Sequence, residues 1–172
     1  MRIAIIGNSG SGKSTLARKL ANGNTTPILD LDTVIWEPNQ IAIARDPDKV
    51  LADLEQFCSS HSEWIIEGCY ATCILAVLRY QPELIFLEPG KEVCIGNCRN
   101  RSWEPHKYAS RADQDSMLDF LLDWVGDYYR RDDDRSLQAH QALFDEYRGP
   151  KRLVTNSVGA SVHSTRQNAA FR

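Results

Sequence analysis

The chain contains 172 residues with a mass of 19.5 kDa, a length that fits one globular domain. Its hydrophobic share of 42% and charged share of 25% are ordinary for such a domain. A formal net charge of -3 disfavours functions that depend on bulk attraction to nucleic acid or to a membrane. The apolar run near the N-terminus is too short for a signal-peptide core or a membrane span, so we expect a cytoplasmic protein.

The first strong signal is a short apolar run followed by a glycine-rich segment. Residues 2–6 are rich in β-branched side chains, which predicts a buried parallel strand. The segment that follows has the form G-x-x-x-x-G-K-S, and the apolar periodicity after it predicts a helix over residues 16–21. The predicted phosphate-binding residues are Gly7, Asn8, Ser9, Gly10, Ser11, Gly12, Lys13, Ser14 and Thr15.

The chemistry of this segment follows from its residue types. Its glycines allow the loop to curl until backbone N–H groups point at phosphate oxygens, next to the positive end of the helix. Lys13 is expected to reach the β- and γ-phosphates, Ser14 to bind Mg²⁺, and Thr15 to contact the α-phosphate. We therefore expect a nucleoside triphosphate and Mg²⁺ as ligands.

Acidic residues follow the next two predicted strands. Asp30 and Asp32 come at the end of the strand predicted over 27–31, and side chains two apart on a strand face the same way. Such a pair suits a Mg²⁺ shell and the orientation of a substrate hydroxyl, although two solvated turn residues are the alternative. Glu67 ends the strand predicted over 64–67, where open α/β sheets bind ligands.

The remaining pattern alternates strands with helices, which predicts a parallel sheet covered by helices on both faces. Further strands are predicted over 83–87 and 151–155. Further helices are predicted from Asp46-Pro47 onward and over 72–80, 91–101, 113–130 and 136–148. Residues 132–134, three aspartates between arginines, are predicted to form a solvated loop.

Five cysteines occur in the chain, and an odd number without an export signal indicates free thiols. Cys69 and Cys73 form one C-x-x-x-C pair and Cys94 and Cys98 another, a spacing that also occurs in zinc sites. The second pair lies in a stretch with helical periodicity. Buried structural thiols are therefore the interpretation that we favour, with zinc binding as the alternative.

Several motifs together resemble those of a known superfamily. They are Ile5–Thr15, Leu29–Val34 with Trp36 and Pro38, Arg45-Asp46, Trp64–Gly68 with Tyr70, and Ile85–Leu87. On these the chain resembles the small P-loop kinases, which include adenylate, shikimate and gluconate kinases. More narrowly, it is similar to bacterial P-loop proteins labelled topology-modulation proteins or adenylate-kinase-like ATPases. The resemblance implies a three-layer α/β/α fold, a five-stranded parallel sheet in the order 2-3-1-4-5, and a helical lid.

The resemblance also implies roles for individual residues. Asp30 would support Mg²⁺ and Asp32 would contact the substrate. Glu67-Gly68 would correspond to the Asp-Gly pair of adenylate kinase, with the longer side chain of glutamate in place of aspartate. The lid would extend over about 97–113 and carry cations, namely Arg99, Arg101, Lys107 and Arg111. The predicted catalytic residues are Lys13, Asp32, Glu67, Arg99 and Arg101. The predicted metal ligands are Ser14 and Asp30.

One departure from adenylate kinase bears on the acceptor. The arginine that follows its Asp-Gly-Phe has no counterpart in Cys69-Tyr70-Ala71-Thr72, which disfavours a mononucleotide acceptor. Arg45 and Arg79 offer the same charge elsewhere, and Tyr70 with Trp36 indicates a partly aromatic pocket unless both belong to the core. The predicted substrate-binding residues are Asp32, Arg45, Gly68 and Tyr70.

These observations lead to two hypotheses about function. The first is a Mg²⁺- and ATP-dependent kinase that acts on a small molecule, formed by residues 1–156 with 157–172 as a flexible tail. The second is a nucleotide-binding regulatory ATPase or interaction module with low turnover. Neither a membrane nor a nucleic acid is an expected partner, and the sequence does not identify the acceptor.

Overall fold

The computed structural model describes residues 1–21, 23, 25–37, 40–104 and 108–156. The strands are β1 (Arg2–Gly7), β2 (Ile28–Asp30), β3 (Trp36–Glu37), β4 (Gln40–Ala44), β5 (Trp64–Gly68), β6 (Glu83–Leu87) and β7 (Lys151–Val154). The helices are α1 (Lys13–Ala21), α2 (Asp32–Ile35), α3 (Pro47–Ser60), α4 (Ala71–Val77), α5 (Lys91–Arg99), α6 (Arg111–Ser116), α7 (Leu118–Asp127) and α8 (Leu137–Glu146), with a 3₁₀ turn at Leu78–Tyr80. The tail predicted over 157–172 lies outside the described residues.

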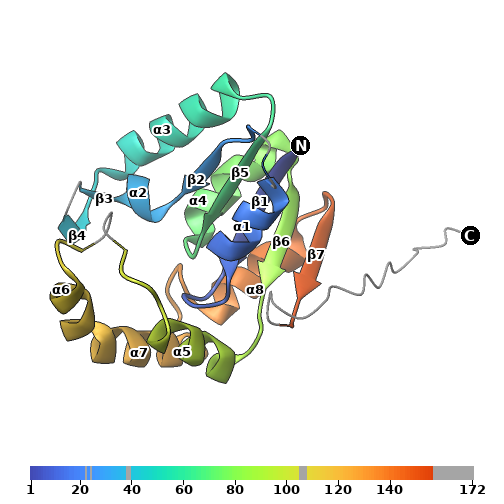
Figure 1. Ribbon diagram of the computed structural model, residues 1–172. Helices are drawn as coiled ribbons and strands as arrows, with labels where there is room; N and C mark the ends of the chain where they lie inside the picture. Colours follow the sequence, from blue (N-terminus) through green and yellow to red (C-terminus); the bar gives the residue numbers. More distant parts are fainter. Residues whose placement is uncertain (22, 24, 38–39, 105–107, 157–172) are drawn as a thin grey trace, which may run out of the picture.

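Five strands form one parallel sheet in the order β2-β5-β1-β6-β7 (Figure 1). Counted among themselves, these strands have the order 2-3-1-4-5, so the predicted topology is confirmed. The central strands are buried on both faces, as their uninterrupted apolar runs predict. The sequence pattern did not predict β3 and β4, which pair as a separate antiparallel hairpin.

Helices cover both faces of the sheet, which completes the three expected layers (Figure 1). Alternate strand residues face α1 on one side, where Ile5 and Ile65 pack against Ala17 and Ala21. The opposite face packs against α3, α4 and α8, and this core is the larger one. The buried residues of α3 begin at Val50, behind an N-cap at which Asp46 accepts a hydrogen bond from the backbone N–H of Asp48.

The helices α5, α6 and α7 run along the end of the sheet at which the parallel strands finish (Figure 1). A single helix was predicted over 113–130, but the chain forms α6 and α7 with a break at Met117. The N–H of Met117 bonds to the carbonyl of Gln114, a tightened i to i−3 bond that ends α6. The apolar α7 then packs against α5 around Cys94, Cys98 and Val125.

The aspartates at 132–134 differ from the predicted solvated loop. Only Asp132 is exposed. Asp133 accepts ion pairs from Arg131 and Arg135. The side chain of Asp134 accepts a hydrogen bond from the backbone N–H of Thr72, 2.7 Å away, at the start of α4. A carboxylate from a distant loop therefore caps this helix, a contact that no local pattern can predict.

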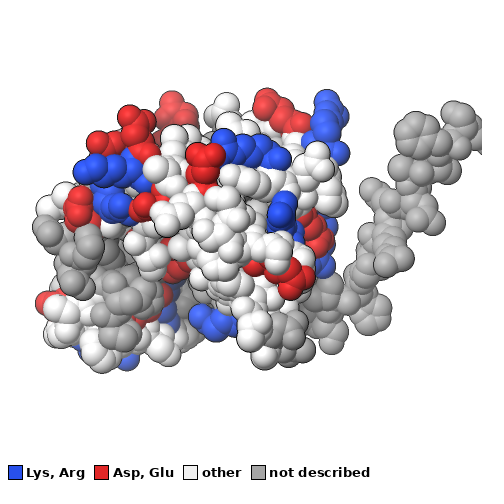
Figure 2. Space-filling view, turned by 90° about the horizontal axis from the view of Figure 1, so that it is seen from above, with Lys and Arg blue, Asp and Glu red and all other residues white. Residues whose placement is uncertain are grey.

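The five cysteines are free and buried, and no group of three His, Cys, Asp or Glu side chains suited to a metal ion occurs within the described ranges. Burial raises the pKa of the Cys94 thiol to about 12, a value at which it stays protonated. None of the helices in these ranges combines the length and apolar character that a membrane span needs. On the face seen in Figure 2, acidic and basic side chains are interspersed.

Candidate functional site

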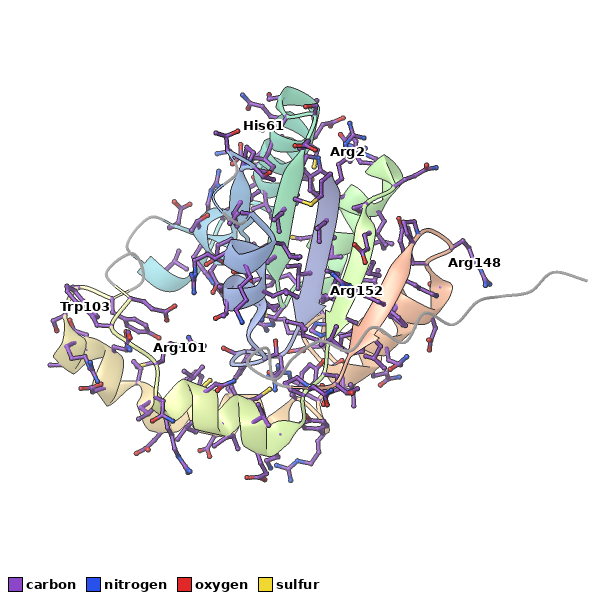
Figure 3. The ribbon with its side chains drawn as sticks, turned by 45° about the vertical axis from the view of Figure 1, so that its right-hand side comes forward. Arg2, His61, Arg101, Trp103, Arg148 and Arg152 are labelled. Carbon is purple, nitrogen blue, oxygen red and sulfur yellow. The ribbon has the colours of Figure 1, made fainter. Side chains whose placement is uncertain are left out.

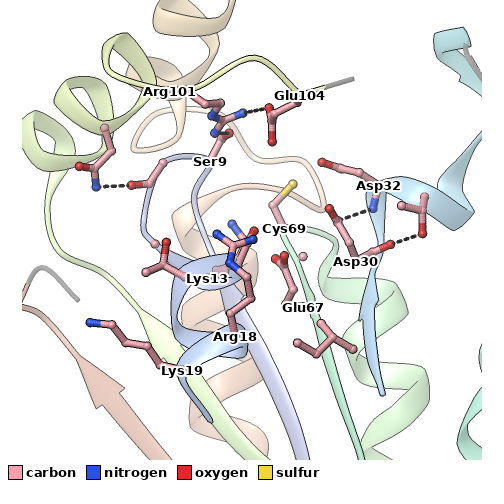
Figure 4. Close-up of a pocket in the computed structure, with 18 of the residues that line it drawn as sticks. Ser9, Lys13, Arg18, Lys19, Asp30, Asp32, Glu67, Cys69, Arg101 and Glu104 are labelled. Carbon is pink, nitrogen blue, oxygen red and sulfur yellow. Dashed lines mark hydrogen bonds and ion pairs between the residues drawn. The ribbon is translucent and has the colours of Figure 1, made fainter. Parts of the chain in front are cut away.

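A cavity of about 790 Å³ opens where the parallel strands end and α1 begins (Figure 4). Its lining includes both cationic side chains and carboxylates. Its lining residues are Ser9, Gly10, Gly12, Lys13, Ser14, Thr15, Arg18, Lys19, Ile28, Asp30, Asp32, Thr33, Glu67, Gly68, Cys69, Asn97, Asn100, Arg101 and Glu104. This position matches the crevice in which open α/β sheets bind ligands.

The glycine-rich loop from Gly7 to Gly12 has a shape that depends on its glycines. Gly10 and Gly12 have φ values of 77° and 96°, which side-chain-bearing residues rarely adopt. The ammonium group of Lys13 donates to the carbonyl of Asn8 at 2.8 Å, and the backbone N–H of Ser11 donates to the same carbonyl at 3.2 Å. These two hydrogen bonds hold the start of the loop against its end, and the loop leads directly into the N-terminus of α1.

Two helices support this loop from behind. The side chain of Asn8 is buried and donates to the carbonyl of Val125 in α7 at 3.0 Å. The side chain of Asn97 in α5 donates to the carbonyl of Gly10 at 2.8 Å. A Cβ atom on Gly10 would lie 2.3 Å from the carbonyl oxygen of Cys94, so loop and helix are in direct contact. The loop is therefore held in one position before any ligand binds.

Two carboxylates lie side by side on the sheet face that α1 covers. Asp30 on β2 and Glu67 on β5 are register partners in adjacent parallel strands. Burial raises the pKa of Glu67, while Lys13 lowers it, Asp30 raises it and a hydrogen bond from Ser14 lowers it. The three oxygen-bearing side chains of Ser14, Asp30 and Glu67 therefore converge within one charged cluster.

This cluster fits a magnesium ion on chemical grounds. Hydroxyl and carboxylate oxygens are the ligands that Mg²⁺ prefers, and it keeps several waters when only one or two carboxylates bind it. A divalent cation would also relieve the repulsion between Asp30 and Glu67, which adds to burial in raising the pKa of Glu67. Ser14 and Asp30 were the predicted ligands, and both line the cavity.

Asp32 begins α2 and also lines the cavity. Its backbone N–H donates to the carboxylate of Asp30 at 3.0 Å, which fixes the turn between β2 and α2. Its own carboxylate accepts a 2.7 Å hydrogen bond from the hydroxyl of Tyr70. Both aspartates therefore make hydrogen bonds within the fold, and the roles predicted for them stay predictions.

The predicted lid cations separate into different environments. Arg101 lines the cavity, forms a 3.0 Å ion pair with Glu104 and donates to the hydroxyl of Ser9 at 3.2 Å. Burial lowers the pKa of Arg101, but Glu104, Cys98 and Tyr108 together raise it by more, so the net shift is upward and the cation persists. Arg99 is exposed and lies outside this cavity, and Arg111 pairs with an exposed aspartate on its own helix. Lys107 lies outside the described residues.

Figure 3 places Arg101 and Trp103 on the segment that follows α5, at the end of the sheet where α5, α6 and α7 gather. In Figure 4 the Arg101–Glu104 pair lies over the glycine-rich loop at Ser9, away from Asp30 and Asp32. Of the predicted lid cations described here, Arg101 is thus the one that reaches the loop.

Two residues predicted to bind substrate do not line the cavity. Arg45 donates to the carbonyl of Val34 at 2.8 Å and pairs with Asp53 at 2.7 Å, so its charge serves the packing of α2 against α3. Tyr70 is 7% exposed and belongs to the larger core. Gly68 does line the cavity, and a Cβ there would collide with Leu31, 2.7 Å away.

Sequence reasoning missed several polar residues of the cavity wall. Asn100 and Glu104 come from the end of α5 and the segment after it, and Arg18 projects from α1. A signal for Arg18 was present, because it follows Ser14 by one helical turn and so shares its face. Asn100 and Glu104 fall within the lid predicted over about 97–113, but that prediction names only the cations, because residue type does not show which other side chains reach the cavity.

No protein-family model matches the sequence, and no curated protein matches it. Among solved structures, the chain is similar to a sugar kinase from Janibacter sp. HTCC2649, with 16% identity, coverage of 89% of this chain and 83% of that one, and a TM-score of 0.49. It is also similar to shikimate kinase from Bacteroides thetaiotaomicron, with 17% identity, 84% and 97% coverage and a TM-score of 0.47. Deoxyadenosine kinase from M. mycoides gives 10% identity, 90% coverage of both chains and a TM-score of 0.48.

These likenesses are distant, so the chain's own geometry carries the conclusion about its fold. The parallel sheet in the order 2-3-1-4-5, the glycine-rich loop between β1 and α1, and helices on both faces are the features that the resemblance implied. The narrower resemblance to topology-modulation proteins stays a prediction. The chain has the α/β fold expected for a small P-loop kinase.

Proposed function

We propose that the protein binds Mg·ATP and transfers the γ-phosphoryl group to a hydroxyl of a small molecule. One observation carries this proposal: a single cavity is lined by Lys13, by residues of the glycine-rich loop, and by Asp30, Asp32 and Glu67. Phosphoryl transfer needs this combination, because cations and N–H groups must hold the phosphates while carboxylates organise the nucleophile and the metal ion.

The roles follow from position. The loop N–H groups and Lys13 would bind the β- and γ-phosphates, and Arg101 would add positive charge from the side of Ser9. Ser14 and Asp30 would hold Mg²⁺, with Glu67 acting through water. The ion would supply charge neutralisation on the phosphates. We propose residues 1–156 as one nucleotide-binding domain with a lid over about 97–113.

The transfer step involves the acceptor hydroxyl and Asp32. Asp32 would accept the hydroxyl proton as the acceptor oxygen forms its bond to the γ-phosphorus. The bond between that phosphorus and the β–γ bridging oxygen would break, and its electron pair would leave with ADP. The cavity lining carries several polar side chains, among them Thr33, which follows Asp32 in α2, and this suits an acceptor with several hydrogen-bonding groups.

The test measures ADP release from Mg·ATP, with and without a small-metabolite extract, for the wild type and two variants. Lys13→Ala should abolish release, because no other described residue supplies an ammonium group at that point of the loop. Asp32→Asn should lower kcat far more than the affinity for ATP. Release that the extract does not stimulate, together with clear ATP binding, would contradict the kinase and support the nucleotide-binding regulatory module.

A further inference from the structure

Three side chains link the β3–β4 hairpin to the cavity wall. The indole N–H of Trp36 on β3 donates to the hydroxyl of Tyr70 at 3.0 Å. The hydroxyl of Tyr70 donates to the carboxylate of Asp32 at 2.7 Å. The rings of Trp36 and Tyr70 also meet edge to face, with centroids 6.4 Å apart. Residues from three separate elements thus form one continuous chain of hydrogen bonds.

Chemistry fixes the direction of this chain. An indole nitrogen can only donate, so the oxygen of Tyr70 must accept from Trp36. The single proton of that hydroxyl is then directed to Asp32, whose ionised carboxylate can only accept. Burial raises the pKa of Tyr70, and the nearby Cys69 and Asp32 raise it further, so the hydroxyl keeps its proton. The bond to Asp32 is charge-assisted and hence among the stronger ones.

The two ends of the chain differ in their access to the cavity. Asp32 lines the cavity, whereas Tyr70 is 7% exposed and packs in the core that lies between the sheet and α3, α4 and α8. A ligand in the cavity can therefore touch Asp32, but Tyr70 is not part of the wall that it would meet. Any effect of Tyr70 on such a ligand has to pass through Asp32.

The far end of the chain is itself held in place. The backbone N–H of Arg45, which follows β4, donates to the carbonyl of Ile35, next to Trp36, at 2.8 Å. The guanidinium of Arg45 bonds to Val34 and to Asp53 on α3. The backbone around Trp36 is thus fixed to α3, and the hydrogen-bond chain transmits this placement to Asp32.

We propose that Tyr70 is a positioning residue, which orients the Asp32 carboxylate toward the acceptor hydroxyl and is itself oriented by Trp36. This inference rests on the proposed function, and it replaces the prediction that Tyr70 contacts the substrate. A carboxylate that accepts a hydrogen bond from a fixed donor is restrained in its orientation, which is what a proton acceptor needs.

The first arm of the test does not depend on activity. The chain has four tryptophans, and a ¹H–¹⁵N spectrum shows one indole resonance for each, with that of Trp36 assigned by its loss in Trp36→Phe. Tyr70→Phe should move this resonance and leave the other three in place. Asp32→Asn should move it as well, because the tyrosine hydroxyl carries the change along the chain. Tyr80→Phe, which removes a hydroxyl bonded to Arg79 at the surface, should leave it unmoved.

The second arm measures ADP release while Mg·ATP and the small-metabolite extract are each varied in turn with the other held fixed. Tyr70→Phe should lower kcat roughly ten- to hundred-fold, since small misplacements of a reacting group have effects of this size. Its KM for Mg·ATP should stay within about twofold of the wild type, because the loop is untouched. Trp36→Phe should lower kcat by less, and Tyr80→Phe should match the wild type.

The outcomes separate this inference from the proposed function. A wild type without Lys13-dependent release overturns both. If the wild type is active and Tyr70→Phe has an unchanged kcat, the positioning role alone is overturned. The same follows if the indole resonance of Trp36 keeps its position in both Tyr70→Phe and Asp32→Asn. A raised KM for the extract with unchanged kcat in Tyr70→Phe would overturn the inference in favour of direct substrate contact.

Discussion

The most constrained residue of the site is Gly10. Its φ of 77° is unfavourable for any residue with a side chain, and it also lacks the space for one. A Cβ atom would lie 2.3 Å from the carbonyl oxygen of Cys94 and 2.8 Å from the sulfur of Cys98. Both the backbone angle and the close approach of α5 therefore require glycine at this position.

Gly10→Ala should accordingly lower the free energy of unfolding by about 2–4 kcal/mol, from backbone strain plus overpacking. Gly23→Ala is the matched control, because its φ is 73° but no atom lies within 4 Å of the added Cβ. That variant should lose only about 1–2 kcal/mol. Urea unfolding of both measures the difference, and equal losses would show that α5 yields to the added methyl group.

Among the elements, α8 is tied to the site by a buried histidine. The Nε2 of His140 lies 2.9 Å from the carbonyl of Cys69, and its Nδ1 lies 2.8 Å from the hydroxyl of Tyr128, the residue that follows α7. A carbonyl can only accept, so the neutral ring carries its proton on Nε2 and accepts from Tyr128 through Nδ1. His140 therefore joins α7, α8 and the end of β5, with its side chain fully buried.

The same histidine should make stability depend on pH. Burial lowers the pKa of His140 to about 4, from its ordinary value of 6.5. Between pH 6.5 and pH 4 the unfolded chain therefore binds more protons than the folded chain. The stability that the buried, neutral His140 contributes is complete above pH 6.5 and is lost as the pH falls toward 4. The loss should approach about 3 kcal/mol at pH 4.

Unfolding experiments at several pH values on the wild type and His140→Phe would isolate this contribution. The variant is expected to be less stable at neutral pH, because it loses both hydrogen bonds, but its stability should fall less steeply between pH 6.5 and 4. Parallel slopes in the two proteins would show that His140 is not the group responsible.

On the scale of elements, the sequence predicts what local patterns control. Strand β1, the loop and α1 are contiguous in the chain, and their residue types favour a strand, a tight turn and a helix in that order. The structure contains these three elements, so their prediction is confirmed. The hairpin of β3 and β4 was not predicted because β3 has only two residues and shows no alternation of apolar and polar side chains. The capping of α4 by Asp134 and the anchoring of α2 by Arg45 both join residues far apart in the chain or on different elements. In such cases the residue type shows that a side chain is charged, but it does not show which group that side chain will pair with.

At the scale of the whole molecule, the candidate ligand site lies where several elements meet. The loop, α5 and the ends of β2 and β5 all border the cavity. A ligand that binds only the folded state stabilises it by mass action. Mg·ATP at about a hundred times its Kd should add about 2.7 kcal/mol, which corresponds to a rise in Tm of roughly 5–10 °C for a chain of this size.

A thermal unfolding series would check this with Mg·ATP, with ATP plus EDTA, and with Lys13→Ala. The rise should shrink when EDTA removes the metal ion, since Ser14, Asp30 and Glu67 would then lose the cation that joins them to the phosphates. Lys13→Ala should show little rise under any of these conditions. A rise that survives in this variant would place the nucleotide elsewhere in the molecule.

The contact between Gly10 and α5 has a consequence for how this protein can diverge. Positions 10, 94 and 98 occupy one crowded volume, in which the missing Cβ of the glycine makes room for a helix turn. The small cysteines at 94 and 98 fill that turn while staying buried. Across natural variants these three positions should behave as a single unit: a bulkier residue at one of them should appear only together with a shifted helix or a smaller neighbour.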